Sequence, residues 1–311
     1  MWSSCGGVSA GVCASGGVGG GVCAPDPQVA GAAGDARAGA AAGTGEGEGG
    51  VSVVIPKAEF LENLKDFERI VQETIEEKEE RTLEIIREAL EMAECPVLAC
   101  SWGKDSFLML HLVRKVRPDI PVVFTNTGVE FPETYRFRDK ILAEENINYT
   151  ELKPETTFWK IVDEYGYPSR SRYMEVKANK NGVPMCCALL KDEPAEKYYK
   201  EIGADLLFVG LTYDEGRLRR TKIIESGPLY YIKSKGWMKC LPIAYWSESD
   251  VFGYHWKHNL PLNDGYKHSP RIGCMPCTGH IGWEKQMAKA NFKMYRKVTK
   301  DMGRPILEEW L

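Results

Sequence analysis

From Cys95 onward, short apolar runs alternate with segments of helical periodicity. Four of the runs have the length and composition of buried strands, namely residues 96–100, 121–124, 149–152 and 206–211. Helical segments follow the first two runs, at residues 107–116 and 132–146. Such strand–helix alternation predicts a parallel sheet with helices on both of its faces. The sequence therefore indicates an α/β fold of the Rossmann-like type, with an open, mostly parallel sheet.

Composition and periodicity divide the rest of the chain. The first 50 or so residues are dominated by Gly, Ala, Ser and Val, and such a segment buries too little apolar surface to offset the entropy of ordering it. The next segment has a helical repeat that fits one long helix or two shorter ones. We expect a disordered low-complexity tail, a helical segment, the α/β domain and a C-terminal helical segment, spanning residues 1–52, 53–94, 95–282 and 283–311.

The overall composition excludes several classes of protein. A net charge of -4 argues against a surface that binds nucleic acid throughout, although a local basic patch is compatible with it. The basic stretch 285–300 is either a docking helix with a solvated face or such a patch. No apolar stretch approaches the roughly 20 residues that span a bilayer, and the N-terminus lacks the pattern of a secretory signal. We therefore expect a cytoplasmic protein without a membrane partner, whose cysteines stay thiols or bind metal.

Residues 101–106, Ser-Trp-Gly-Lys-Asp-Ser, lie between the first predicted strand and its helix. A glycine-containing turn in this position directs backbone N–H groups and a helix N-terminus at an anion. Lys104 adds a positive charge, Gly103 permits close approach, and Asp105 suits the helix N-cap or a magnesium ion. The order of residues matches neither G-x-x-x-x-G-K-[ST] nor G-x-G-x-x-G. The pattern indicates a phosphate-binding loop, and the structural alternative is an ordinary capped turn.

Two cysteine pairs, Cys186-Cys187 and Cys274-x-x-Cys277, have an arrangement that suggests a metal site. Cys-x-x-Cys lets two thiolates reach one metal from a single turn, and a second pair completes a set of four. Soft thiolate sets bind iron–sulfur clusters or zinc, so both stay open at this point, as does a site without metal. The remaining cysteines are interpreted as incidental thiols of the tail or as small buried hydrophobes: Cys5, Cys13, Cys23, Cys95, Cys100 and Cys240.

The loop resembles the S-G-G-K-D-S pyrophosphate loop of the N-type ATP pyrophosphatases and the related phosphoadenosine phosphosulfate (PAPS) reductases, with Trp102 in place of the first glycine. Residues 126–135, Asn-Thr-Gly-Val-Glu-Phe-Pro-Glu-Thr-Tyr, are similar to the D-T-G-x-x-F-x-E-T-Y segment of that family, and residues 210–220 to its G-x-R-x-x-E-S-x-x-R stretch. The match runs in order over roughly residues 95–280. It implies the adenine nucleotide alpha hydrolase-like fold.

The same resemblance implies a set of nucleotide- and phosphate-binding residues, which are Ser101, Trp102, Gly103, Lys104, Asp105, Ser106, Thr127, Gly128, Arg217 and Arg220. Within this set, Lys104, Asp105 and Arg217 are the candidates for catalysis. Guanidinium groups bind phosphate or sulfate in a bidentate manner, and the alternative for the arginines is a solvated basic turn. Arg170 and Arg172 are further candidates for the same anion site.

The cysteine pairs resemble the [4Fe-4S] signature of adenylyl-sulfate reductases, in which a Lys-x-x-Pro stretch, here residues 191–194, follows the adjacent cysteines. This resemblance implies that a [4Fe-4S] cluster is the cofactor, with zinc as the alternative. The implied ligands are Cys186, Cys187, Cys274 and Cys277.

Two differences between this sequence and the reductases of the family favour one of the family's activities over the other. The reductases use a nucleophilic cysteine near the C-terminus, and no cysteine follows Cys277 here; their loops usually lack Lys104, which ATP-splitting relatives keep. We therefore expect an iron–sulfur ATP pyrophosphatase that uses ATP with Mg²⁺ to activate an acceptor, such as tRNA or DNA, for sulfur transfer. The alternatives are an adenylyl-sulfate or PAPS reductase with an external thiol, and a non-catalytic nucleotide- or metal-sensing module. Expected partners are an adenine nucleotide, a sulfur- or electron-donor protein and, by analogy alone, a second copy of the chain.

Overall fold

The structure, a computed structural model, describes residues 55–168, 183–280 and 282–306. The expectations for the tail at 1–52 and for Arg170 and Arg172 concern residues outside these ranges. None of the helices in the described ranges is both long and apolar enough to cross a membrane.

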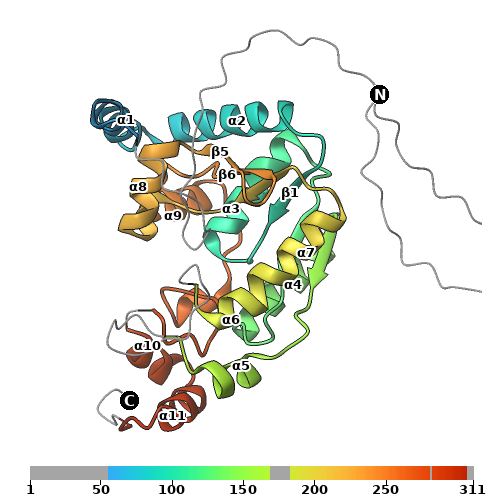
Figure 1. Cartoon of the computed structure of the whole chain (residues 1–311), viewed down its shortest axis with the longest axis vertical. Helices are drawn as coiled ribbons and strands as arrows, with labels where there is room; N and C mark the ends of the chain where they lie inside the picture. The colour runs from blue at the N-terminus through green and yellow to red at the C-terminus, as the bar shows by residue number, and fades with distance from the viewer. Residues whose placement is uncertain (1–54, 169–182, 281, 307–311) are drawn as a thin grey trace, which may run out of the picture. The chain divides into compact units, whose positions relative to one another are not determined.

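Within the described residues, six strands form one sheet in the order β3-β2-β1-β4-β6-β5. Figure 1 labels three of them, β1, β6 and β5. Neighbouring strands run parallel, except that β5 pairs with β6 in the antiparallel direction at one edge. The chain adds β2 and β3 on one side of β1 and later places β4 on the other, so the strand order reverses between β1 and β4. The predicted open, mostly parallel sheet is therefore confirmed. The strands are β1 Pro96–Ala99, β2 Val122–Thr125, β3 Tyr149–Leu152, β4 Leu206–Val209, β5 Leu229–Ile232 and β6 Trp237–Cys240.

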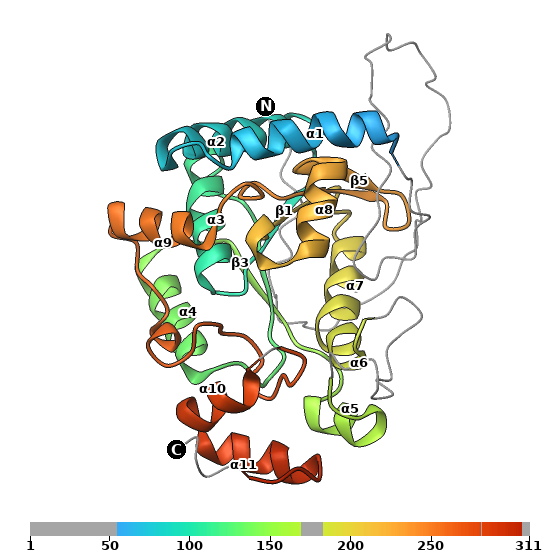
Figure 2. The ribbon, with the colours of Figure 1, turned by 90° about the vertical axis from the view of Figure 1, so that its left-hand side faces the viewer.

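Helices cover both faces of the sheet, as predicted. Successive side chains of a strand point to opposite faces, and accordingly Leu98 packs in one hydrophobic core while Val97 packs in a second. The first core includes residues of α2, α3, α4 and α9, and the second includes residues of α1, α7 and α8 (Figure 2). These helices are α1 Lys57–Ile70, α2 Ile75–Glu91, α3 Lys104–Val116, α4 Pro132–Glu144, α7 Glu193–Glu201, α8 Arg217–Ser226 and α9 Glu248–Lys257.

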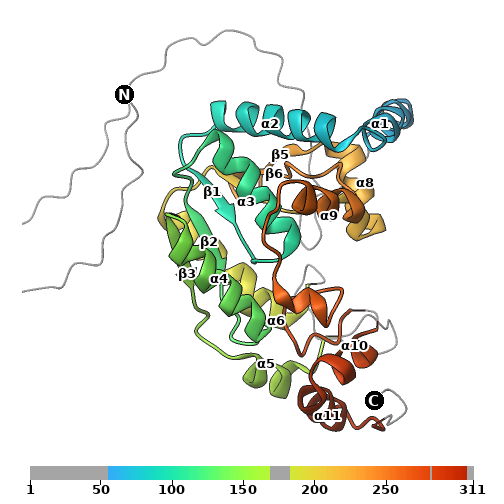
Figure 3. The same ribbon diagram turned by 180° about the vertical axis from the view of Figure 1, so that it is seen from behind.

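The C-terminal part of the described chain forms a helical pair. Helices α10 (Trp283–Ala290) and α11 (Phe292–Asp301) pack against each other, and Figure 3 shows them next to one another below the sheet. Their apolar side chains bury Phe131, which directly precedes α4. The remaining short elements are α5 Phe158–Tyr165, α6 Met185–Cys187, the π-helix Ala188–Asp192 and two 3₁₀ turns, Tyr213–Glu215 and Asp264–Lys267.

The N-terminal helical segment is fixed to the α/β domain by a buried ion pair. The sequence left one helix or two open, and the chain forms two, with Thr74 and Glu77 making a capping box at the start of α2. Lys78 is 3% exposed, and its Nζ donates to Asp250 Oδ2 at 2.7 Å and to the Val71 carbonyl at 2.9 Å. Burial raises the pKa of Asp250, but hydrogen bonds from Lys78 and Ser247 outweigh that effect and lower it overall.

We predict that Asp250→Asn lowers the free energy of unfolding by about 3–5 kcal/mol near neutral pH, because it leaves the Lys78 ammonium buried without a counter-charge. An acid whose pKa is lowered by folding stabilises the protein above its unfolded pKa, about 4, and loses that contribution as the pH falls through the folded value. Urea denaturation at pH 7 and at pH 3 measures both effects. A difference between wild type and variant that does not shrink at pH 3 would contradict the assignment.

Candidate nucleotide and thiol site

The loop 101–106 joins β1 to α3 at the carboxyl edge of the sheet, beside β4. Open α/β sheets bind ligands at such a point of reversed strand order. Gly210, directly after β4, lies against the start of α3, where a Cβ would come within 2.9 Å of the Ser106 Cα. Since the obstructing atoms belong to the backbone, glycine at 210 allows β4 and the loop to approach this closely.

Trp102 turns its side chain into the protein core. The indole is fully buried and its ring centroid lies 5.9 Å from that of Tyr149. The backbone at Trp102 has φ +61°, a left-handed conformation that favours glycine, and Asn263 Nδ2 donates to the Trp102 carbonyl at 3.3 Å. Trp102, the residue that departs from the family loop, therefore anchors the loop to the core and does not place its side chain on the solvent side.

We predict that Trp102→Gly lowers the free energy of unfolding by about 2–4 kcal/mol, because losing a buried aromatic costs about 3–5 and the positive φ returns about 1. Binding of Mg-ATP at a temperature well below the unfolding transition should stay within about threefold of wild type, since the indole points away from the loop surface. Thermal denaturation and calorimetry measure the two quantities. A gain of ATP turnover in this variant would instead mean that the tryptophan blocks the loop.

Lys104 and Asp105 form a charged pair at the start of α3. Of the two roles that suit Asp105 in the sequence, the N-cap was wrong: the left-handed Trp102 and the extended Gly103 start the helix two residues earlier, so that Gly103 is the N-cap. Asp105 lies in the first turn, where the helix dipole favours its negative charge. Lys104 is 9% exposed, and its Nζ donates to the two Asp105 carboxylate oxygens at 2.8 and 3.1 Å. A buried ammonium thus lies at the N-terminus of the helix.

The two serines and the loop backbone complete a polar cradle. Ser106 Oγ donates to the Gly103 carbonyl at 3.1 Å and lies 3.1 Å from Ser101 Oγ. The Lys104 N–H donates to the Tyr266 hydroxyl at 3.0 Å, and His255 Nε2 lies 3.0 Å from the Lys104 carbonyl. Burial lowers the pKa of His255, which favours a neutral ring that donates to this carbonyl. Tyr266 and His255, which both follow β6 in the chain, therefore hold the backbone of the cradle in place.

Arg217 and Arg220 lie at the start of α8, in the connection that follows β4. Both are exposed, and the Arg220 guanidinium lies 5.2 Å from the ring centroid of Tyr213. Arg219, between them, pairs with Glu215. Both arginines therefore lie in the connection that begins at the carboxyl end of β4, and their side chains face the solvent.

Thr127 and Gly128 follow β2, and the structure relates Thr127 to the cysteines. Thr127 Oγ1 donates to the buried Glu130 carboxylate at 2.9 Å and lies 3.5 Å from Cys274 Sγ. Glu130 and Cys274 also form an antiparallel bridge. Gly128 is exposed with φ +76°, and its N–H donates to Asn126 Oδ1. The segment after β2 thus contacts the Cys-x-x-Cys turn and holds it in place.

The two cysteine pairs meet at one place. Cys186 and Cys187 lie on α6, they hydrogen-bond to each other, and Cys186 interacts electrostatically with both Cys274 and Cys277. The hydrogen bond raises the pKa of Cys186 and lowers that of Cys187. Burial raises the pKa of Cys274 to about 12 and also raises that of Cys277. The electrostatic interaction with Cys274, and after it the one with the Glu130 carboxylate, outweighs burial and raises the pKa of Lys191, so its ammonium lies beside the thiols.

The donor set fits a thiolate-bound metal centre in its chemistry. Four soft sulfur donors converge from two elements, and the Lys191 ammonium offsets part of the charge that they carry as thiolates. Within the described ranges, no three His, Cys, Asp or Glu side chains have the geometry to hold a metal ion. Metal binding would therefore require the sulfur atoms to draw closer together.

The segment from Asn263 to Cys277 connects the cradle to the thiols. Tyr266 bonds to the loop, and a Cβ at Gly103 would lie 4.0 Å from the Ile272 side chain, two residues before Cys274. Sequence reasoning missed several polar residues that hold the site, because each makes its contact over more than a hundred residues and stands at no defined position of a local motif: Glu130, His255, Asn263 and Tyr266.

Comparison with known proteins identifies relatives. The phosphoadenosine phosphosulfate reductase domain matches residues 95–280. An adenosine 5'-phosphosulfate reductase of Staphylococcus haemolyticus is 31% identical over 189 residues, covering 60% of this chain and 71% of that protein. An uncharacterised protein of Methanocaldococcus jannaschii is 33% identical over 229 residues, covering 72% and 45%.

Solved structures with a similar fold are more distant. A phosphate complex of the PAPS reductase from Candida auris has a TM-score of 0.48 at 20% identity, covering 65% of this chain and 95% of that one. The U34-tRNA thiolase NcsA from Methanococcus maripaludis, solved with its [4Fe-4S] cluster, has a TM-score of 0.40 at 15% identity, covering 75% and 81%.

Proposed function

The chain belongs to the PAPS reductase family, and we propose that it is an iron–sulfur member that splits ATP into AMP and pyrophosphate to activate an acceptor for sulfur transfer. The observation that carries this proposal is Lys104, whose buried ammonium lies at the N-terminus of α3 at the point of reversed strand order. A positive charge and a helix N-terminus at one place match the terminal phosphates of ATP.

The proposed reaction has two displacements. An acceptor oxygen attacks the α-phosphorus of ATP, the bond to the bridging oxygen breaks, and pyrophosphate leaves with the electron pair. A sulfur nucleophile then attacks the acceptor carbon, and AMP leaves with the former acceptor oxygen. Because the first leaving group gains negative charge, groups that stabilise pyrophosphate lower the barrier.

The residues of the loop have separate roles in this scheme. Lys104, together with the Ser101 and Ser106 hydroxyls, binds the leaving pyrophosphate, for which Lys104 exchanges its contact with Asp105. Asp105 is then free to bind the Mg²⁺ that accompanies ATP. Arg217, exposed at the start of α8, can reach an anionic substrate from the solvent side.

Cys186, Cys187, Cys274 and Cys277 are the proposed ligands of a [4Fe-4S] cluster. When bound, such a cluster supplies a position for the transferred sulfur. Thr127 and Glu130 hold Cys274 from the segment after β2, and Lys191 compensates negative charge.

A second candidate function, reduction of adenylyl sulfate or its 3'-phosphorylated form, is favoured by the 31% identity to an adenosine 5'-phosphosulfate reductase. In that reaction a thiol attacks sulfur, AMP or its 3'-phosphorylated form leaves, and a second thiol releases sulfite. An external protein would supply the thiols. Adenylyl sulfate and PAPS have a sulfate where ATP has its two terminal phosphates. The two functions therefore differ in the group that Lys104 would bind.

Binding of Mg-ATP against adenylyl sulfate and PAPS, measured by calorimetry on the anaerobic full-length protein, separates the candidates. We expect at least tenfold tighter binding of Mg-ATP, because one extra charge-assisted contact contributes about 1.5–3 kcal/mol. Preference for a sulfonucleotide would replace the proposed function with the reductase. Binding of Mg-ATP without pyrophosphate release in the presence of cell-derived acceptor RNA and a sulfur donor would favour the sensing module.

A further inference from the structure

Helices α10 and α11 concentrate positive charge in an otherwise acidic chain. Between residues 283 and 304 there are seven basic and two acidic residues, a net charge of +5, although the whole chain carries -4. On α11, Tyr295, Val298 and Thr299 face the core. The opposite side exposes the basic face, which we define as Lys293, Arg296, Lys297 and Lys300.

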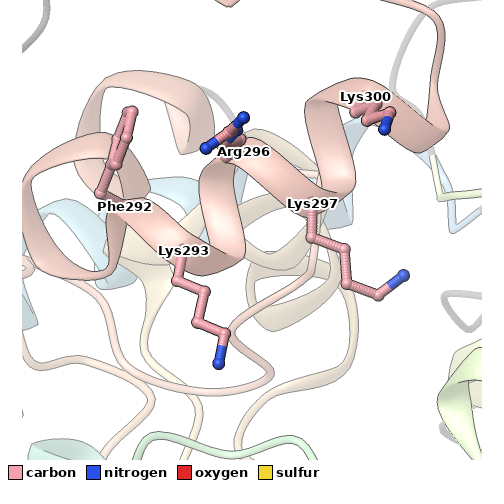
Figure 4. A pocket seen from close by; sticks show the side chains of 5 residues that line it. All are labelled: Phe292, Lys293, Arg296, Lys297 and Lys300. Atoms are coloured by element: carbon pink, nitrogen blue, oxygen red, sulfur yellow. The ribbon is translucent and has the colours of Figure 1, made fainter.

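The basic face is positioned to receive an anion. Together with Phe292 it lines an open pocket of about 400 Å³, and Figure 4 shows these side chains projecting from one helix, with Phe292 at the first turn. Lys297 pairs with Asp301 at 2.7 Å and lies 4.4 Å from the ring centroid of Trp159. Among the described residues, the other three cations make no ion pair within 4.0 Å.

The basic face is also tied to the thiols. Trp283 Nε1 donates to the Met275 carbonyl at 2.6 Å, and Met275 lies between the cysteines of the Cys-x-x-Cys turn. Asn291 caps the start of α11 and places its Nδ2 3.9 Å from Met275 Sδ. A ligand held on α11 is therefore linked to the turn that carries Cys274 and Cys277 by one contact from the N-cap of α11 and one from α10.

We propose that the basic face of α11 binds the phosphate backbone of a folded RNA and that Phe292 stacks on one of its unpaired bases. The cations span about 10 Å of helix, and a duplex has one charge per about 1.7 Å of its axis, so several phosphates fall within reach. The Phe292 ring is 37% exposed beside Lys293, and aromatic platforms next to basic groups bind unpaired bases, which RNA loops present. The inference rests on the proposed function in naming RNA as the acceptor class.

The test is fluorescence anisotropy with labelled unfractionated tRNA on the full-length, cluster-loaded protein, from about 0.05 to 0.2 M salt. The triple variant Lys293→Ala, Arg296→Ala, Lys300→Ala should lower the slope of log K against log salt by about 2 to 3 and weaken binding about 100-fold at 0.1 M salt. A matched variant, Lys57→Ala, Lys65→Ala, Arg87→Ala, removes three exposed cations from α1 and α2 and should retain wild-type binding. Equal losses in both variants would overturn the proposal.

Phe292→Ala should weaken tRNA binding about tenfold and leave binding of a duplex DNA of equal charge unchanged, because only unpaired bases stack. An unchanged tRNA affinity, or duplex DNA that binds as tightly as tRNA, would overturn the assignment to RNA. No ATP is needed in these assays. Failure here therefore leaves the pyrophosphatase test intact, whereas failure of ATP cleavage with RNA binding retained would refute the proposed function alone.

Discussion

Lys104→Ala should slow acceptor-dependent pyrophosphate release from ATP by about 100- to 1000-fold, the usual loss when one preorganised charge-stabilising donor is removed. The ammonium is buried at the helix N-terminus, whereas the guanidinium groups of Arg217, Arg220 and Arg271 are solvent-exposed and are less suited to replace it. Pyrophosphate release under anaerobic, single-turnover conditions measures the chemical step. Iron content should not change, because the cysteines lie on other elements.

The matched control for this prediction is Lys160→Ala, which removes an exposed lysine from α5. It should release pyrophosphate at the wild-type rate. Lys104→Arg keeps the charge but not the compact ammonium, and it should recover only part of the rate. If Lys104→Ala releases pyrophosphate at the wild-type rate and has the circular dichroism spectrum of the wild type, the proposed role of the loop in binding pyrophosphate is contradicted.

The sheet was predictable because its strands are short apolar runs whose pattern is local. β1, β2 and β3 begin and end within one residue of the expected positions, and β4 ends two residues before the expected one. The β5–β6 pair was not predicted, although Leu-Tyr-Tyr-Ile in β5 favours a strand. Each strand has only four residues, and the three lysines between residues 229 and 240 interrupt the apolar pattern. Local patterns thus predict the uninterrupted apolar strands but not this hairpin.

Only those parts of the candidate site that lie in a sequence motif were predictable. The loop 101–106 and the two cysteine pairs are visible as motifs, and the structure brings the pairs together. The N-cap at Gly103 depends on the conformation of Trp102, which tertiary packing decides. The family motif predicts that Thr127 binds the nucleotide, and only the structure shows that its hydroxyl also contacts Cys274. Contacts between distant segments determine these details, and a single sequence does not contain them.

Cys274→Ser should reduce the iron bound to the anaerobically purified protein from about four atoms per chain to below one, because a [4Fe-4S] cluster requires four thiolates. Cys274 is the most constrained of the four, since Thr127 and Glu130 both contact its sulfur and its backbone pairs with Glu130. A serine oxygen is a harder donor at a shorter bond length and cannot take its place. Loss of visible charge-transfer absorbance and of acid-labile sulfide should accompany the loss of iron.

Cys240→Ser separates loss of metal from loss of stability. Cys240 is fully buried in β6 and belongs to the sheet core, not to the thiol group. A serine there buries a hydroxyl at a cost of about 1–3 kcal/mol, so the variant should melt earlier while keeping its iron. Cys274→Ser, in contrast, should lose its iron. Stoichiometric zinc without iron in the wild-type protein would assign the same four thiols to zinc, and a Cys274→Ser protein that keeps both iron and absorbance would remove Cys274 from the ligand set.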